Sequence, residues 1–251
     1  MLVMLYGLVC YFAFFGAILY AIGFVGNFVV PKSINTGIIE SPAKAAAIDA
    51  LLLGLFAIQH TIMARPGFKK WWTRIVPVAI ERSTFVLAAS LLLMLLFWQW
   101  RPLPKVIWSI ENETVRALLV GVSMLGWVLV FYATFLIDHF DLFGLRQTFF
   151  HWRGWTYSHP PFKKPLLYRL VRNPLMLGFV LAFWATPVMT QGHLLFAGLS
   201  TAYIFVGIQF EERDLLRILG EDYRLYRRRT PMIFPWPRKG PATEPAPSQS
   251  T

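Results

Sequence analysis

Three charged residues flank a pair of apolar runs near the end of this 251-residue chain. Arg172 precedes the first run, residues 175–189, and Glu211 and Glu212 follow the second, residues 194–210. If both runs cross a bilayer as a helical hairpin, the guanidinium and the two carboxylates meet at one membrane face. Such a group suits a ligand that carries both an acid and an amine, because arginine binds carboxylates with two parallel donors.

Local signals favour the hairpin. Pro174 is well placed as the first residue of a helix, where its missing N–H costs nothing, and Thr190-Gln191-Gly192 has the composition of a tight turn. Gly178, one turn beyond Pro174, would let a ligand approach the backbone closely. Taken by itself, the spacing also fits an arginine that ends a basic loop and two glutamates that begin a surface helix.

Two further polar groups lie at the ends of other apolar runs of the chain. One follows the run at about 115–137, and the other lies between the runs at about 44–64 and 81–100. Their members are Asp138-His139, Asp141 and Arg146-Gln147 in the first, and Gln59-His60 with Glu81-Arg82 in the second. A histidine among them could take the proton of a thiol, whose thiolate is the reactive form. Each group could equally anchor a helix at the interface or form a structural ion pair.

The motif R-N-P-x-x-x-G, then the hairpin, then E-E and G-E-x-Y-x-x-Y, resembles the integral-membrane methyltransferases. These include the isoprenylcysteine carboxyl methyltransferases and the phospholipid N-methyltransferases. Their usual first motif is R-H-P-x-Y-x-G, so this chain has Asn173 for the histidine and Met176 for the tyrosine. The pairs Gln59-His60 and Glu81-Arg82 and the runs HFDLFGLRQ and FWATPVMT are similar to those of bacterial methanethiol S-methyltransferases, over nearly the whole chain.

This resemblance implies an enzyme that moves a methyl group from S-adenosylmethionine to methanethiol, releasing dimethyl sulfide and S-adenosylhomocysteine. The implied cofactor-binding residues are Tyr168, Arg172, Asn173, Pro174, Gly178, Glu211 and Glu212. The candidate catalytic residues are His139, His60, Arg146, Glu81 and Arg82. No metal site is expected, because methyl transfer from a sulfonium needs none and the five histidines have no HExxH spacing.

The composition is that of a membrane protein. Hydrophobic residues make up 56% of the chain and charged residues only 15%, against about 25% charged in an ordinary soluble domain. The net charge of +11 does not indicate nucleic acid, because the basic residues flank the apolar runs. The single cysteine, Cys10, cannot form an internal disulfide.

We therefore expect an all-α polytopic membrane protein with about five to six transmembrane segments, including the C-terminal hairpin that frames the cofactor site. Residues 1–236 form one domain, and residues 237–251 have the composition of a disordered tail. The other expected spans are residues 2–30, about 44–64, 81–100 and 115–137. Residues 211–229 are expected to form a helix, and residues 140–171 a lid over the site.

The distribution of basic residues predicts the orientation. Of the 24 Lys and Arg residues, 19 lie in the segments 65–82, 138–173 and 211–251. With six crossings, these segments and both termini fall on one side, which the positive-inside rule makes the cytoplasm of a bacterial inner membrane. The expected partners are a small thiol and the lipid bilayer, with no nucleic acid and no obligate protein partner.

Two other interpretations stay open. A larger acceptor, such as an isoprenylcysteine carboxylate or a lipid amine, would use the same cofactor but needs a lateral opening to the bilayer. A non-catalytic membrane sensor or assembly protein could retain this fold. This alternative stays open because Asn173 and Met176 replace the histidine and the tyrosine of the usual motif. Binding of S-adenosylhomocysteine would distinguish an enzyme from such a sensor.

Overall fold

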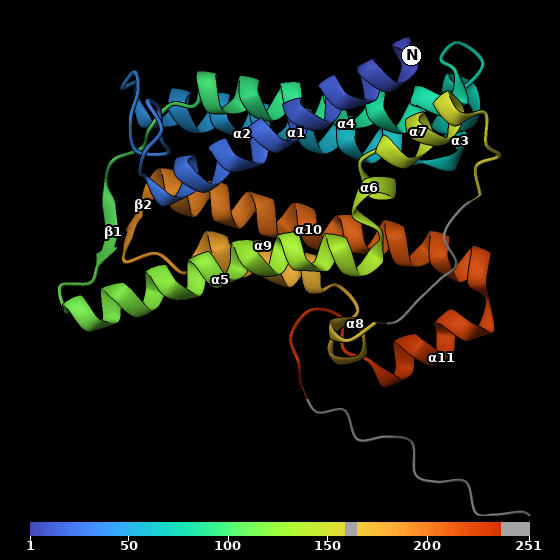
Figure 1. Cartoon of the computed structure of the whole chain (residues 1–251). Coiled ribbons are helices and arrows are strands. Elements are labelled where there is room, and N and C mark those ends of the chain that lie inside the picture. Colours follow the sequence, from blue (N-terminus) through green and yellow to red (C-terminus); the bar gives the residue numbers. More distant parts are fainter. Residues whose placement is uncertain (159–164, 237–251) are drawn as a thin grey trace, which may run out of the picture.

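The computed structural model describes residues 1–158 and 165–236 (Figure 1). Five helices in this part of the chain are long and apolar enough to cross a membrane. They are α1 (Leu2–Gly26), α2 (Pro42–Ala64), α4 (Val78–Gln99), α5 (Glu113–Ile137) and α10 (Gln191–Leu219). The predicted all-α membrane fold is confirmed, and the expected spans agree with these helices to within a few residues at most ends.

A sixth apolar helix, α9 (Pro174–Trp184), has only 11 residues. At 1.5 Å per residue it is about 16 Å long, roughly half the hydrocarbon thickness of a bilayer. It packs along α5, where the backbones come very close. A β-carbon added at Gly178 would lie 2.7 Å from the carbonyl oxygen of Gly126 and 2.9 Å from the backbone nitrogen of Val130.

The helices form two layers, with α1, α2 and α4 in one and α5, α9 and α10 in the other (Figure 1). Large aromatic side chains from both layers fill the space between them and exclude water there. The buried aromatic residues of this core are Phe24, Phe97, Trp100, Trp127, Phe183 and Phe196. Most of these residues lie near the ends of α1, α4 and α9 or near the start of α10, so ring packing holds the layers together in one half of the bundle. The opposite end is left to the charged groups.

The predicted tight turn at Thr190-Gln191-Gly192 is wrong. Helix α9 ends at Trp184, and the chain then runs extended into strand β2 (Val188–Thr190), which pairs antiparallel with β1 (Val106–Ser109). Pro187 accounts for the early end, because a proline disfavours helix in the residue before it. Thr190 is instead the N-cap of α10, and its hydroxyl accepts from the backbone N–H of His193 at 3.2 Å.

The prediction of a single helix over 211–229 is also wrong. Both glutamates lie inside α10, which continues to Leu219, and Gly220 separates it from α11 (Glu221–Arg229). Gly220 has a φ of +56°, a conformation that glycine adopts without strain. Helix α11 can therefore turn back toward α8 (Leu167–Leu170), as Figure 1 shows.

The described parts of the three basic segments gather at one end of the bundle, as predicted. This end carries the N-terminus, α3 (Pro66–Trp72), α6 (His139–Leu142), α7 (Leu145–Arg153) and α11, and the β1–β2 pair lies at the other (Figure 1). The expected lid is partly corrected, because α7 packs against α1 and α4 rather than standing free. Residues 159–164 of that lid, and the predicted tail at 237–251, lie outside the described residues.

Candidate functional site

The guanidinium of Arg172 is enclosed by protein acceptors. Its Nε donates to Glu212 Oε1 at 2.7 Å, and its Nη2 lies 2.6 Å from the same oxygen. Its Nη1 donates to the backbone carbonyl of Arg227 at 3.0 Å and to that of Thr230. The Arg172 and Glu212 side chains are only 2% and 3% exposed, so this pair is an internal structural element.

This pair holds α10 and α11 to the start of α9. The second carboxylate oxygen of Glu212 lies 3.1 Å from Arg227 Nε. Asn173, which replaces the histidine of the usual motif, donates from its backbone N–H and from Nδ2 to the carbonyl of Met232, at 3.1 and 3.2 Å. The R-N-P motif therefore pins the segment after α11 against the hairpin.

Three other motif residues also serve packing. Pro174 is the buried first residue of α9, as predicted. Met176, which stands where the usual motif has tyrosine, packs on the apolar cluster around Ile208 and Ile233. The space in front of Gly178 is filled by α5, so the expectation that this glycine admits a ligand is wrong.

Glu211 has different surroundings from its neighbour. Its residue surface is exposed, while Glu212 is buried. Arg65 and Arg82 both lie close enough to Glu211 for their charges to interact with it. Tyr168 is close as well: its burial, together with the charge of Glu211, raises the pKa of the Tyr168 phenol. Glu211 is therefore the carboxylate of the hairpin that remains available for a ligand.

Arg82, in the first turns of α4, has an incompletely used guanidinium. Its Nε donates to the carbonyl of Leu142 at 2.7 Å, and the group lies over the Phe85 ring at 4.9 Å. Within residues 1–158 and 165–236, the Nη atoms have no hydrogen-bond partner. Glu81, Asp141 and Glu211 lie within electrostatic range. Two donor groups therefore face a region of negative charge without a fixed acceptor.

His60 lies next to this guanidinium. Its ring stacks on Phe56 with centroids 5.4 Å apart and packs on Phe85 at 4.8 Å and on Tyr203 at 6.4 Å. Its Nδ1 is buried and has no hydrogen-bond partner in the part of the chain that the structure describes. Arg82 is near enough for the charges to interact. A buried nitrogen without a hydrogen-bond partner destabilises the fold, and a ligand that bonds to this nitrogen would remove that penalty.

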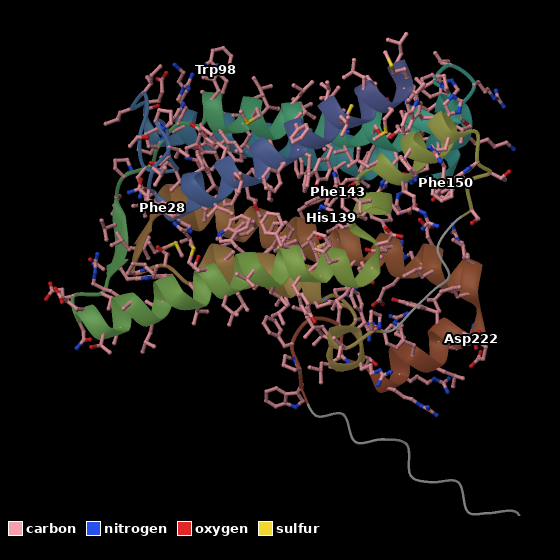
Figure 2. The ribbon with its side chains drawn as sticks, in the orientation of Figure 1. Phe28, Trp98, His139, Phe143, Phe150 and Asp222 are labelled. Carbon is pink, nitrogen blue, oxygen red and sulfur yellow. The ribbon has the colours of Figure 1, made fainter. Side chains whose placement is uncertain are left out.

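His139 is not in this group. Its Nε2 is 2.8 Å from the Tyr11 hydroxyl and its Nδ1 is 2.7 Å from the Thr134 hydroxyl. The ring stacks on Phe135 at 4.1 Å, and Figure 2 shows it beside Phe143, between the helical layers. Burial lowers its pKa. With both nitrogens engaged, the packing favours a structural histidine over the predicted base.

Arg146 is also engaged locally. Its Nη1 is 2.8 Å from Asp138 Oδ2 and 4.0 Å from Asp141 Oδ1, and its guanidinium lies over the Phe150 ring. Asp138 caps α6 by accepting from the backbone N–H of Asp141 at 3.1 Å. These contacts hold α6 and α7 in place, and the expected catalytic role of Arg146 stays a prediction.

Two residues near this site were not among the site residues expected from the sequence. Arg65 pairs with Asp214 at 2.8 Å, donates from Nε to the Thr61 carbonyl and lies over the Phe210 ring. Tyr157 donates to Asp141 Oδ1 at 2.8 Å, and burial raises its pKa to about 12. The signal for Arg65 was its place directly after an apolar span. For Tyr157 we find no signal in the sequence.

The candidate site is thus a charged cluster at one end of the bundle. It is built by α2, α4, α8 and α10, which carry His60, Arg82, Tyr168 and Glu211.

The chain is similar to several proteins that are named methanethiol S-methyltransferase. A methanethiol S-methyltransferase of Bradyrhizobium diazoefficiens is 58% identical over 234 residues, 93% of this chain and 82% of the relative. One of Mycobacterium tuberculosis is 54% identical over 238 residues, 95% of this chain and 98% of the relative.

The chain belongs to the methanethiol S-methyltransferase family. Nurim of Homo sapiens is a more distant relative, 31% identical over 179 residues, which are 67% of each chain. No family model matches the chain, and no solved structure is significantly similar to it. The family membership establishes a membrane-embedded methyltransferase and agrees with the resemblance seen in the sequence motifs.

Proposed function

We propose that this protein methylates methanethiol to dimethyl sulfide with S-adenosylmethionine as methyl donor. The observation that carries the proposal is the high identity to methanethiol S-methyltransferases along almost the whole chain. The residues of the charged cluster suit such a donor. Glu211 would bind its ammonium group or ribose hydroxyls, and the free donors of Arg82 would bind an anionic group.

His60 and Arg82 form the part of the site that binds the methyl acceptor, methanethiol. The aromatic side chains of Phe56, Phe85 and Tyr203 surround the histidine, which suits a small apolar thiol. His60 Nδ1 accepts the thiol proton, and the Arg82 charge stabilises the thiolate that results. A sulfonium methyl group supplies the electrophile.

The atoms and electrons of the reaction balance. A lone pair of the thiolate sulfur forms the new carbon–sulfur bond. The electrons of the broken bond return to the donor sulfur, which leaves S-adenosylhomocysteine neutral at that atom, and the thiol proton passes to solvent. Arg172 and Glu212 take no part in this step, and act by holding α9, α10 and α11 in register.

The test is turnover by the purified full-length protein in detergent. Incubation with S-adenosylmethionine and methanethiol should give dimethyl sulfide in the headspace and an equal amount of S-adenosylhomocysteine. Hydrogen sulfide, longer thiols, a prenylcysteine and phosphatidylethanolamine serve as competing acceptors. Methylation of the prenylcysteine or of the lipid, without dimethyl sulfide, would assign the alternative acceptor class. No product together with no binding of S-adenosylhomocysteine would favour a non-catalytic protein.

We further propose that the end with the charged cluster faces the cytoplasm of a bacterial inner membrane. The support is the excess of Lys and Arg at this end, since basic loops are retained on the cytoplasmic side. S-adenosylmethionine is also made there. Reporter fusions at Lys70 and after Thr251 should both report the cytoplasm, and a fusion at Glu111 the opposite side. A reversed pattern would contradict the proposal.

A further inference from the structure

A pocket of about 320 Å³ lies between α8 and α11, apart from the residues assigned to methyl transfer. Arg169 of α8 lines it together with four residues of α11 and the residue that follows the helix. The lining residues of α11 and its end are Asp222, Leu225, Tyr226, Arg229 and Thr230. Two arginines from different helices thus line one hollow.

The walls of this pocket are fixed by buried contacts. The Tyr226 hydroxyl donates to the backbone carbonyl of Tyr168, which joins α11 to α8. Arg172 donates to the carbonyls of Arg227 and Thr230 and so holds the last turn of α11. Because these contacts are made within the protein, the fold itself organises the pocket, which lowers the entropy lost on binding.

The charge of the pocket favours an anion. The last turn of α11 carries three arginines, of which Arg227 lies against Glu212 and Arg229 lines the pocket. The lining includes one carboxylate, Asp222, in the first turn of α11, two turns away from Arg229. Arginine forks match phosphate oxygens well, so a monoanionic phosphodiester is the group that this arrangement suits.

The surroundings of the pocket are apolar and exposed. Helix α8 leads within a few residues into the apolar helix α9, so the pocket lies at the boundary of the membrane. Exposed apolar side chains belong to the residue before α8, to α8, to α11 and to the segment that follows α11. They are Leu166, Leu170, Leu225, Phe234 and Trp236. Tryptophan at such a boundary is typical of the lipid headgroup region.

We propose that this pocket binds the headgroup phosphate of an anionic phospholipid. Arg169 and Arg229 bind the phosphate, and the acyl chains lie along the exposed apolar side chains around Leu170 and Phe234. The apolar rim favours a lipid over a soluble phosphate ester, because it continues the hydrophobic surface of the bilayer. The net positive lining favours phosphatidylglycerol over lipids with a balancing cation.

The experiment is native mass spectrometry of the full-length protein in detergent, with phosphatidylglycerol, phosphatidylethanolamine and phosphatidylcholine of the same acyl chains. The wild type should retain phosphatidylglycerol over phosphatidylcholine on the order of tenfold, given what each basic residue near a membrane contributes. Arg229→Gln and Arg169→Gln should each remove most of this preference. Asp222→Asn should increase it.

The matched control is Arg224→Gln. Arg224 is also on α11 and carries the same charge, but it pairs with Glu221 on an exposed face and does not line the pocket. Equal losses in Arg224→Gln and Arg229→Gln, or no lipid preference in the wild type, would overturn the proposal. So would displacement of the lipid by glycerol phosphate at equal concentration, which would make this a soluble-phosphate site.

Lipid retention is measured without methyl transfer, so the result is independent of the proposed activity. If Arg229→Gln does not fold, Arg229→Lys together with Asp222→Asn keeps the test open. The lysine variant retains the charge and should lose only part of the preference, while the asparagine variant should gain. A lack of response in both would count against the site.

Discussion

Glu211 and Glu212 are neighbours on α10, yet they have opposite surroundings. Glu212 is 3% exposed in its side chain and bound by Arg172, whose donors also hold two backbone carbonyls. Glu211 is exposed, and one of the two arginines near it, Arg82, keeps its Nη donors free of protein partners among the described residues. Successive residues of a helix point about 100° apart, so one turns into the protein and the other toward the cluster.

An arginine and a glutamate can serve two purposes in this protein, to stabilise the fold or to bind a ligand. Where each guanidinium nitrogen contacts a protein oxygen, as in Arg172, a ligand can enter only by breaking a buried pair, which is strongly unfavourable. Where donors remain unsatisfied beside an orphaned nitrogen such as His60 Nδ1, a ligand restores the missing hydrogen bonds. We therefore assign stability to Arg172 and Glu212, and ligand binding to Arg82 and Glu211.

The largest effect is expected from breaking the buried pair. Arg172→Ala or Glu212→Ala leaves an uncompensated buried charge and should lower the free energy of unfolding by about 3–5 kcal/mol. Thermal unfolding in detergent measures this. The control is Glu221→Ala, which breaks an exposed Arg–Glu pair on α11 and should cost below about 1 kcal/mol. If the Arg172→Ala variant has normal stability but no longer binds S-adenosylhomocysteine, Arg172 contacts the ligand instead of stabilising the fold.

The next effect is that of Arg82 on turnover. Arg82→Lys keeps the positive charge but removes the fork. The structural loss is small because, among residues 1–158 and 165–236, only Nε donates a hydrogen bond to protein, at Leu142. Loss of one oriented donor at a site of charge development typically lowers the rate on the order of 100-fold. Methanethiol turnover should fall by that factor at an unchanged unfolding temperature. Arg74→Lys, at an exposed position of the neighbouring loop, is the control and should be fully active.

A smaller effect is expected at Glu211. Glu211→Gln removes the charge but keeps the shape, and the loss of a charge-assisted hydrogen bond typically costs about 1.5–3 kcal/mol. Calorimetry should therefore show S-adenosylhomocysteine affinity reduced by at least about tenfold. Glu221→Gln, on the exposed face of α11, should bind as the wild type does. Unchanged affinity in Glu211→Gln would mean that the ligand is held elsewhere.

The long helices and their common ends could be predicted from the sequence, because length, hydropathy and basic residues are local properties. The hairpin was predicted only in part. Its turn is replaced by strand β2, whose partner β1 lies about 80 residues earlier in the chain, and no local pattern shows such a pairing. The role of Gly178 was likewise hidden, because it depends on contact with Gly126 of another helix.

The motif residues could be located from the sequence, but the sequence could not tell which of them stabilise the fold and which bind a ligand. The sequence predicts that Arg172 meets the two glutamates, and the structure brings Arg172 and Glu212 into contact. Which glutamate the arginine binds depends on the continuation of α10 past both and on the carbonyls of Arg227 and Thr230, which α11 brings back. His60 and Arg82 were candidates from their place at the ends of apolar runs and from the family resemblance, and only the packing separates them from His139.

The smallest effect concerns His139, where stability and catalysis can be told apart by pH. Burial holds the pKa of His139 below its ordinary value, and the nearby Asp138 opposes this only in part. The unfolded chain therefore takes up the proton more readily than the folded protein. The histidine contributes its full stability above its unfolded pKa of about 6.5, and that contribution is lost as the pH falls below it.

His139→Gln removes the titration and retains donors and acceptors for Tyr11 and Thr134. Between pH 7 and 5, its unfolding free energy should fall less steeply than that of the wild type, by at most about 1.4 kcal/mol per pH unit. Replacing the exposed His151 with glutamine should leave the wild-type slope unchanged. If instead the slope of His139→Gln is normal while turnover collapses at pH 7 and recovers at higher pH, His139 is the base, and the role assigned to His60 passes to it.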